Sequence, residues 1–212
     1  MRGIAKAVVC GGLVLAALSG CGALLMGGAV IGSGLVVTDR RTTGIQIEDE
    51  TIELKAASRL RDLATLGYLN VTSYNRLVLL TGEVPGEAER VAAEQTVGRI
   101  ENVRSVVNEL IVSGNSSFGS RSGDAVLSAK VKATLVDAKD VQANAYKVVT
   151  ERGIVYLMGR VTEREAGRGA DLARAVPGVQ KVVRVFDILT EGELAALGRP
   201  NAAAAAASES GK

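Results

Sequence analysis

The sequence predicts an α+β protein built from two tandem αββαβ modules, each a three-stranded mixed sheet with two helices, behind a lipoprotein signal peptide. Three observations support this prediction: an export signal that ends at Cys21, an internal repeat at a spacing of 77 residues, and the same order of helix and strand patterns in both repeats. Such self-similarity indicates two related folding units, because each repeat carries one complete set of elements.

The export signal occupies residues 1–20. Arg2 and Lys6 form a short basic start, an apolar segment covers residues 7–17, and Leu-Ser-Gly-Cys follows at residues 18–21. This order of basic, apolar and small residues is typical of a secretory signal. The small residues before a cysteine match the lipobox of bacterial lipoproteins, in which the thiol accepts a diacylglycerol. We therefore predict cleavage after residue 20 and lipidation of Cys21, including fatty acyl chains such as palmitate.

Residues 21–45 are predicted to form a Gly-rich lipidated tether. The alternative is an uncleaved membrane anchor, because residues 7–37 carry no charge and are long enough for a span of about 20 residues. The many glycines oppose a helix there, since each costs about 1 kcal/mol relative to alanine. Two acyl chains would anchor the protein stably. Cys10 leaves with the signal, so no disulfide is expected.

The internal repeat fixes the predicted domain boundaries. Residues 71–82 align with residues 148–159, with coinciding apolar positions and a closing glycine. The modules are then residues 46–114 and 124–190, each small enough that packing between them should matter.

The segments outside the modules are assigned by composition. Residues 115–123 are rich in Ser and Gly and are predicted to be a linker. Residues 191–212 become Ala-rich and are predicted to be a disordered tail, with a marginal alanine helix as the alternative.

In the second module, the first helix is expected to begin with Asp124 as its cap. Its buried stripe should be Leu127, Val131 and Leu135, which recur at helical spacing. Two strands should follow at 147–150 and 154–158, joined by a tight turn at residues 151–153.

The second helix of this module should begin with a capping box formed by Thr162 and Glu165. Ala166, Ala170 and Ala173 form its expected inner stripe. Pro177 and Gly178 should end it before a last strand at 179–188.

The first module repeats this pattern. Its first helix should bury Ile52, Ala56, Leu60 and Leu63, its turn should be Asn75-Arg76, its second helix should start near Pro85, and its last strand should cover 103–112. Gly82 and Gly159 are expected to end equivalent strands and to serve backbone geometry, with no ligand contact.

Composition excludes most catalytic chemistry. The chain has no His, and its two cysteines are assigned to the signal and to lipidation. The usual general base, thiol nucleophile and common metal ligand are therefore missing. Glutamates at helix starts are explained by capping. We predict no enzyme, no catalytic residues, no cofactor and no metal site. Phosphate-binding glycine loops and interleaved basic and aromatic residues are also missing, so no nucleic-acid partner is expected.

Charge differs between the modules. Residues 46–114 hold 7 basic and 11 acidic side chains, whereas residues 115–190 hold 12 and 8. An anionic partner should therefore meet the second module. The alternative is that both surfaces are simply solvated.

The whole pattern resembles the dual BON-domain outer-membrane lipoproteins of the DolP/YraP-like group. The likeness is strongest in residues 155–166, VYLMGRVTEREA, and in residues 38–46, TDRRTTGIQ. It covers nearly all of the chain to about residue 190. Gly22, in place of Asp after the lipidated cysteine, resembles the sorting pattern of lipoproteins sent to the outer membrane. The resemblance implies a lipid-anchored protein on the periplasmic face of that membrane.

The resemblance also implies a function and a site. Members of this group bind anionic phospholipid through the second BON domain and support outer-membrane integrity, including at the division site. The implied lipid contacts are Val126, Leu127, Lys130, Lys132 and Ala133. Related proteins tend to have a bulky aromatic where this chain has Val126, so insertion is expected to be shallower. The alternative is that Val126 packs between the modules.

A competing hypothesis is a periplasmic protein-interaction scaffold or chaperone, in which the acidic first module meets envelope-assembly, cell-wall or cell-division proteins. A cell-wall hydrolase is disfavoured because the catalytic residue types are missing.

Overall fold

The computed structural model describes residues 39–114 and 117–197. The predicted signal peptide, Cys21 and most of the predicted tether lie outside this part of the chain, as does the tail beyond Leu197. Within it, no helix is long and apolar enough to cross a membrane.

The first module contains three helices and a sheet. Its elements are α2 (Thr43–Arg59), α3 (Arg61–Ala64), β1 (Tyr68–Tyr74), β2 (Leu77–Val84), α4 (Glu87–Gly98), β3 (Ser105–Asn108) and β4 (Ile111–Val112). Strand β2 pairs antiparallel with β1 and parallel with both β3 and β4. The prediction of a single last strand over 103–112 was wrong. The Asn108 side chain accepts from Leu110 N at 3.2 Å, and this local turn divides the strand in two.

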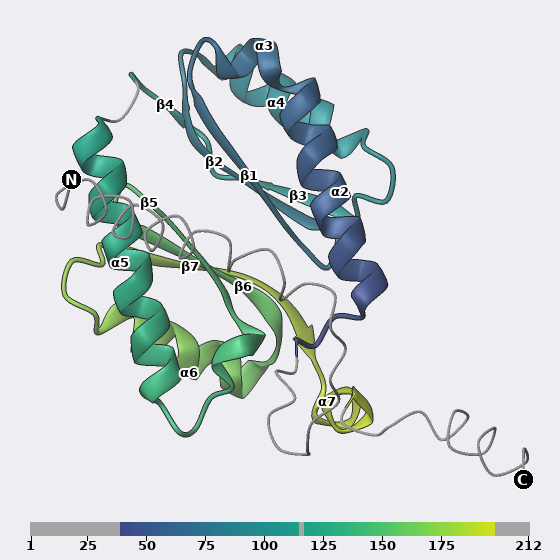
Figure 1. Cartoon of the computed structure of the whole chain (residues 1–212), viewed down its shortest axis with the longest axis vertical. Helices are drawn as coiled ribbons and strands as arrows, with labels where there is room; N and C mark the ends of the chain where they lie inside the picture. The colour runs from purple at the N-terminus through teal and green to yellow at the C-terminus, as the bar shows by residue number, and fades with distance from the viewer. Residues whose placement is uncertain (1–38, 115–116, 198–212) are drawn as a thin grey trace, which may run out of the picture. The chain divides into compact units, whose positions relative to one another are not determined.

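The second module contains α5 (Phe118–Asp137), the short 3₁₀ helix η1 (Ala143–Ala145), β5 (Lys147–Glu151), β6 (Ile154–Thr162), α6 (Glu163–Arg174), β7 (Lys181–Leu189) and α7 (Glu191–Leu197). Strand β6 lies between β5, which is antiparallel to it, and β7, which is parallel. The predicted three-stranded mixed sheet is therefore confirmed. In Figure 1, α5 and α6 cover the face of this sheet that points away from the first module. Helices α2, α3 and α4 cover the face of the first sheet that points away from the second module.

Each module has its own core between sheet and helices, as the periodicity predicted. Ile52, Ala56 and Leu60 are buried in the first core, and Leu63, on α3, packs at its margin. The second core contains the predicted stripes of α5 and α6. A third cluster joins the other faces of the two sheets. Its buried members are Tyr74, Leu79, Tyr156, Met158 and Val185.

The start of α5 differs from the prediction. The helix begins at Phe118 with Ser117 as its cap, whose side chain accepts from Ser120 N. Residues 118–123, predicted as linker, are therefore helical. Asp124 is buried in the second turn and does not cap the helix.

Asp124 instead holds the turn between β5 and β6, and Asp49 on α2 does the same in the first module. Each carboxylate accepts hydrogen bonds at 2.8 Å from both turn amides, those of residues 152–153 and 75–76 respectively. All four turn residues have positive φ, as the type I′ turn of a two-residue hairpin requires. The repeat therefore preserves a carboxylate that fixes the hairpin from a distant helix.

The second helices largely agree with the predictions. The capping box is present in α6, where Thr162 N donates to Glu165 Oε2 at 3.0 Å and Glu165 N donates to Thr162 Oγ1 at 3.4 Å. In the first module, Gly86 is the cap of α4, so Pro85 lies before the helix and not in its first turn.

Gly82 and Gly159 do not end their strands, because β2 and β6 continue beyond them. Their predicted role in backbone geometry is supported. Both have positive φ, and a Cβ at either position would collide with a backbone carbonyl, that of Tyr68 or that of Ala145. These glycines let the neighbouring chain approach closely.

The ends of the modules carry two further corrections. Residues 43–45, predicted as tether, form the first turn of α2. Residues 191–197, predicted as disordered tail, form α7, in which Glu193 caps through Thr190 N at 2.8 Å. Both segments become helical because local side-chain caps satisfy their free backbone amides.

Candidate functional site

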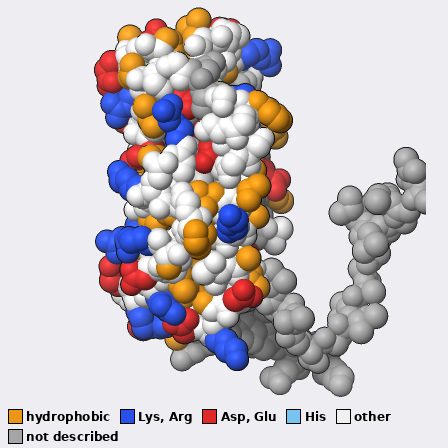
Figure 2. All heavy atoms as spheres, turned by 90° about the vertical axis from the view of Figure 1, so that its left-hand side faces the viewer, with side chains coloured by type: hydrophobic (Ala, Val, Ile, Leu, Met, Phe, Trp, Pro, Cys, Tyr) orange, Lys and Arg blue, Asp and Glu red, His pale blue; other side chains and the backbone are white. Residues whose placement is uncertain are grey.

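The outward face of α5 is the candidate site. Opposite its buried stripe, Phe118 is 79% exposed, Val126 56% and Val136 68%. Phe118, Ala125, Ala129 and Val136 follow one another at spacings that place them on one line of the helix. This row of apolar side chains, with Val126 and Ala133 beside it, is called the apolar stripe of α5. Figure 2 views the molecule from the side on which α5 lies in Figure 1, and hydrophobic side chains gather there around basic ones.

Two exposed lysines flank the apolar stripe. At 100° per residue, Lys130 lies on one side of the line through Val136 and Lys132 lies on the other. A lysine side chain can lay its methylene groups on an apolar surface while its ammonium group stays in water. The arrangement is that of a helix that can lie at the surface of a bilayer.

The predicted contact residues do not all face outward. Val126, Lys130, Lys132 and Ala133 are exposed. Leu127 is only 8% exposed and belongs to the core, because one residue along a helix turns the side chain by 100°. The alternative that Val126 packs between the modules is wrong, since more than half of its surface is exposed.

The sequence interpretation missed Phe118. Its position within a Ser- and Gly-rich segment predicts a linker, and this composition masks the helical spacing between Phe118 and Ala125. The chain therefore does present an aromatic on this helix, about two turns before Val126. The signal that could have revealed it is Ser117, a good helix cap directly before it.

Beside α5 lies a hollow of about 720 Å³. Val126, Leu127 and Lys130 line one wall, and the loop at Pro177-Gly178 lines another. Lys130 thus stands between the outward surface and a recess. Within the described residues, no group of three or more His, Cys, Asp or Glu side chains could hold a metal ion.

Residues 39–42, the segment before α2, contact both modules. Arg40, which is 8% exposed, donates to both carboxylate oxygens of Glu165 on α6, at 2.7 and 2.8 Å. It also donates to the backbone oxygen of Arg160 at 2.8 Å. The pKa of Glu165 is lowered, first of all by the hydrogen bonds from Arg40. The capping glutamate of α6 is therefore also an anchor for a residue 125 positions earlier.

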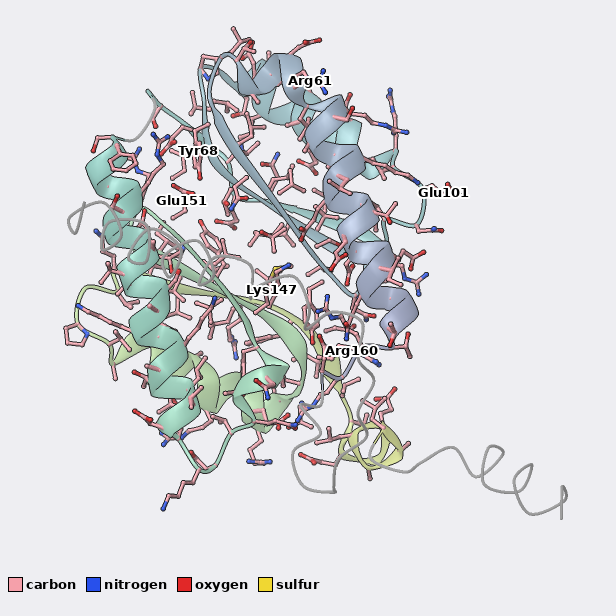
Figure 3. All side chains as sticks on the ribbon, viewed as in Figure 1. Arg61, Tyr68, Glu101, Lys147, Glu151 and Arg160 are labelled. Carbon is pink, nitrogen blue, oxygen red and sulfur yellow. The ribbon has the colours of Figure 1, made fainter. Side chains whose placement is uncertain are left out.

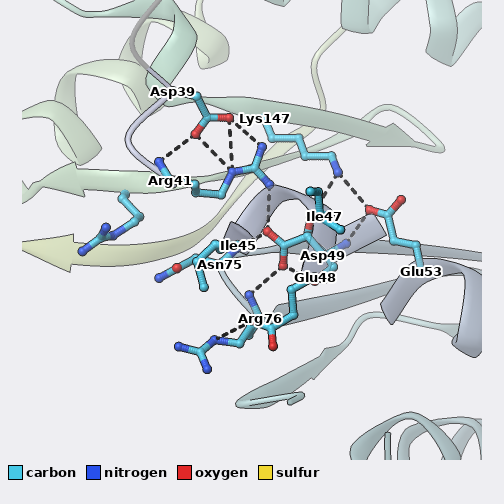
Figure 4. A network of polar contacts seen from close by, with 12 residues as sticks. Asp39, Arg41, Ile45, Ile47, Glu48, Asp49, Glu53, Asn75, Arg76 and Lys147 are labelled. Carbon is cyan, nitrogen blue, oxygen red and sulfur yellow. Dashed lines mark hydrogen bonds and ion pairs between the residues drawn. The ribbon is translucent and has the colours of Figure 1, made fainter. Parts of the chain in front are cut away.

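Arg41 makes the corresponding contacts to the first module. Its guanidinium lies 4.1 Å from the ring centroid of Tyr74 and donates to Asp49 Oδ2 at 2.8 Å (Figure 4). It also donates to Asp39. Lys147 of β5 joins this network by donating to Glu53 on α2 at 2.9 Å. Residues 39–41, predicted as part of the tether, are thus fixed where the two modules meet.

A buried acidic cluster lies at the other end of the contact between the modules. Glu151, labelled in Figure 3, is 5% exposed, and its Oε1 has no hydrogen-bond partner among the described residues. Burial, followed by the neighbouring charges of Glu83 and Asp124, raises the pKa of Glu151 to about 7, while Arg121 and Arg152 oppose this shift. Arg152 also bridges the modules by donating to Glu83 at 3.4 Å.

Glu151→Gln should reduce the dependence of stability on pH. A carboxyl group whose folded-state pKa is raised stabilises the fold below its ordinary value of 4.5, and this contribution is lost as pH rises through about 7. The variant should therefore gain stability relative to the parent as pH increases over this interval. Urea unfolding at pH 5 and pH 8 measures it, with Glu101→Gln, on an exposed side chain, as the control. A constant difference between variant and parent at both pH values would contradict the prediction.

Comparison with known proteins identifies the modules. Residues 48–114 and 123–190 match the family model of the BON domain. The chain is 40% identical over 175 residues to the outer membrane lipoprotein DolP of Haemophilus influenzae, covering 81% of this chain and 90% of that protein. It is 33% identical over 152 residues to the 21 kDa hemolysin of Actinobacillus pleuropneumoniae, covering 70% of this chain and 78% of that protein.

Proposed function

The chain belongs to the BON-domain family, as a DolP-like outer-membrane lipoprotein, and from this premise we propose that its second module binds anionic phospholipid through α5. The lipid anchor at Cys21 holds the protein on the periplasmic face of the outer membrane. Contact of α5 with that membrane then supports its integrity, including at the division site. The observation that carries this proposal is the exposed apolar stripe of α5 between two lysines.

The chemistry of α5 fits a lipid surface better than a small ligand. Phe118 and Val136 offer apolar side chains at positions where a soluble protein gains nothing from exposing them. A lysine near an anionic surface contributes about 1 kcal/mol, and residues 115–190 carry 12 basic against 8 acidic side chains. The short stripe would enter only the interfacial region of the bilayer.

The anchor compensates for a weak contact. A helix that is tethered beside a bilayer meets it at high effective concentration, so the affinity of α5 alone can be modest. The contacts of Arg40 and Arg41 support this arrangement, because they hold residues 39–41, the last part of the predicted tether before α2, against the folded modules. Arg40 thereby keeps the end of the tether beside the module that carries α5.

Reversing the charge of Lys130 and Lys132 to Glu should weaken binding to anionic vesicles by about thirtyfold or more, given about 1 kcal/mol for each lysine lost. Co-sedimentation of the full chain with phosphatidylethanolamine vesicles, with and without phosphatidylglycerol, measures the effect. The matched control is Arg61→Glu with Arg99→Glu, which makes the same charge change at exposed positions of the first module. This control should bind nearly as the parent does. Equal binding to neutral and anionic vesicles, unchanged by the α5 substitutions, would exclude the proposal.

A further inference from the structure

One edge of the first sheet is open. Strand β1 pairs only with β2, and its other side has no partner strand among the described residues. An open edge offers unpaired backbone N–H and C=O groups to another chain, and proteins normally block such edges with charged side chains or cover them.

The hairpin register shows which groups point outward. Tyr74 and Leu77 flank the two-residue turn and form a hydrogen-bonded pair, so the pairs alternate from there along β1. The backbone groups of Leu69, Val71 and Ser73 consequently face away from β2. The contacts of Ser73 agree, because its N–H donates to Glu53 at 2.7 Å and its C=O accepts from Lys147 at 3.1 Å.

Only one end of this edge is blocked. Glu53 and Lys147 occupy the outward groups of Ser73. In the described part of the chain, no group bonds the outward N–H and C=O of Leu69 and Val71, and both residues are partly exposed. The unblocked stretch is therefore the half of β1 that lies nearer to α3.

A groove of about 520 Å³ runs beside the unblocked stretch. One wall is β1 at residues 69–71, and the other is α2 with α3, where Leu54 is 73% exposed. Leu69 and Val71 point their side chains to the helix side of the sheet, where they contact the first core. An added strand would thus pair with the edge and place alternate side chains in the groove.

From this combination we propose that the first module binds an extended peptide segment of a partner protein, which adds to β1 as a further strand. The peptide has an apolar residue for the groove and a neighbouring Lys or Arg. The apolar walls of the groove favour the apolar residue. The carboxylate of Glu50, which lines the groove, and the acidic character of the first module favour the Lys or Arg. Addition of a strand at a sheet edge with side-chain pockets alongside is a general mode of peptide recognition. This site is separate from α5 and does not depend on lipid binding.

Val71→Pro tests the proposal, because proline removes a backbone donor that β2 does not use. The probe is a displayed library of random nine-residue peptides, selected against the purified full chain in detergent. Selected peptides should alternate apolar and basic residues and should protect the amides of Leu69 and Val71 from hydrogen exchange. Their affinity should fall about tenfold or more with Val71→Pro and with Leu54→Glu, and it should persist with Val71→Thr, which keeps the donor.

Three results would overturn the proposal. The first is a selection that enriches no sequence. The second is equal affinity for the Val71→Pro and Val71→Thr variants. The third is a dimer of the chain that Val71→Pro dissociates, because the edge would then serve a second copy. Vesicle binding should be unchanged in both Val71 variants, so failure here is distinguishable from failure of the lipid proposal.

Discussion

Replacing Arg40 by alanine is expected to lower the free energy of unfolding by about 3–5 kcal/mol, which is the usual cost of breaking a buried ion pair. Both side chains of the pair with Glu165 are about 5% exposed, and both carboxylate oxygens are bonded. Without Arg40, the Glu165 carboxylate stays buried with only the capping contacts to Thr162. Urea denaturation at neutral pH measures the loss.

The matched control is Arg168→Ala, which breaks an ion pair with Asp140 at the surface that is made through a single contact. Exposed pairs contribute little, so this variant should unfold close to the parent. The pH dependence gives a second readout. The lowered pKa of Glu165 means that the pair stabilises the fold above the ordinary value of 4.5 and that this contribution is lost as pH falls through the lowered pKa. The difference in free energy of unfolding between the parent and Arg40→Ala should therefore become smaller at acidic pH. A loss no larger than that of Arg168→Ala would show that the segment before α2 is not a structural part of the modules.

Tyr156→Ala should destabilise the protein by about 3–5 kcal/mol, the range for truncating a buried aromatic side chain. Tyr156 is 1% exposed and belongs to the cluster between the two sheets. The module cores do not contain it. The loss should therefore fall mainly on the contact between modules, where Tyr74 and Leu79 would face a cavity. Urea denaturation measures the stability, and small-angle scattering should detect modules that separate before they unfold.

Phe118→Ala is the control for Tyr156→Ala, because it also removes an aromatic ring but from a side chain that is 79% exposed. Its stability should stay near that of the parent. If Tyr156→Ala has the same free energy of unfolding as Phe118→Ala, the modules are held together by their polar contacts, and the apolar cluster between the sheets contributes little to stability.

The features that sequence analysis predicted correctly are local ones. The alanine stripe and capping box of α6 depend on residues three or four positions apart, and such spacing is visible in any sequence. The Asn75-Arg76 turn was equally readable from its flanking strands, whereas the turn predicted at residues 151–153 is shorter, because Glu151 belongs to β5. Some errors were also local, such as the overlooked caps of α5 and α7, but one occurred where distant residues decide. Asp124 has the residue type and place of a helix cap, yet its carboxylate is used by turn amides 28 and 29 positions later.

The candidate site also contains residues that the sequence predicted and residues that it did not. The family resemblance pointed to Lys130 and Lys132 but also to Leu127, which is buried, and composition hid Phe118 in the predicted linker. The groove beside β1 had no sequence signal, because it requires the open edge of one strand and the exposed side of α2 at once.

The sequence by itself determined the predicted lipid anchor, the two modules, their order of elements and the basic character of the second one, because repeats, periodicity and charge are properties of neighbouring residues. Only the tertiary structure decided that Arg40 binds Glu165, that the sheets face each other through Tyr156, and that one edge of β1 stays open. The physical reason is that these contacts join residues far apart in the chain. Their free energy depends on burial, which no local pattern records.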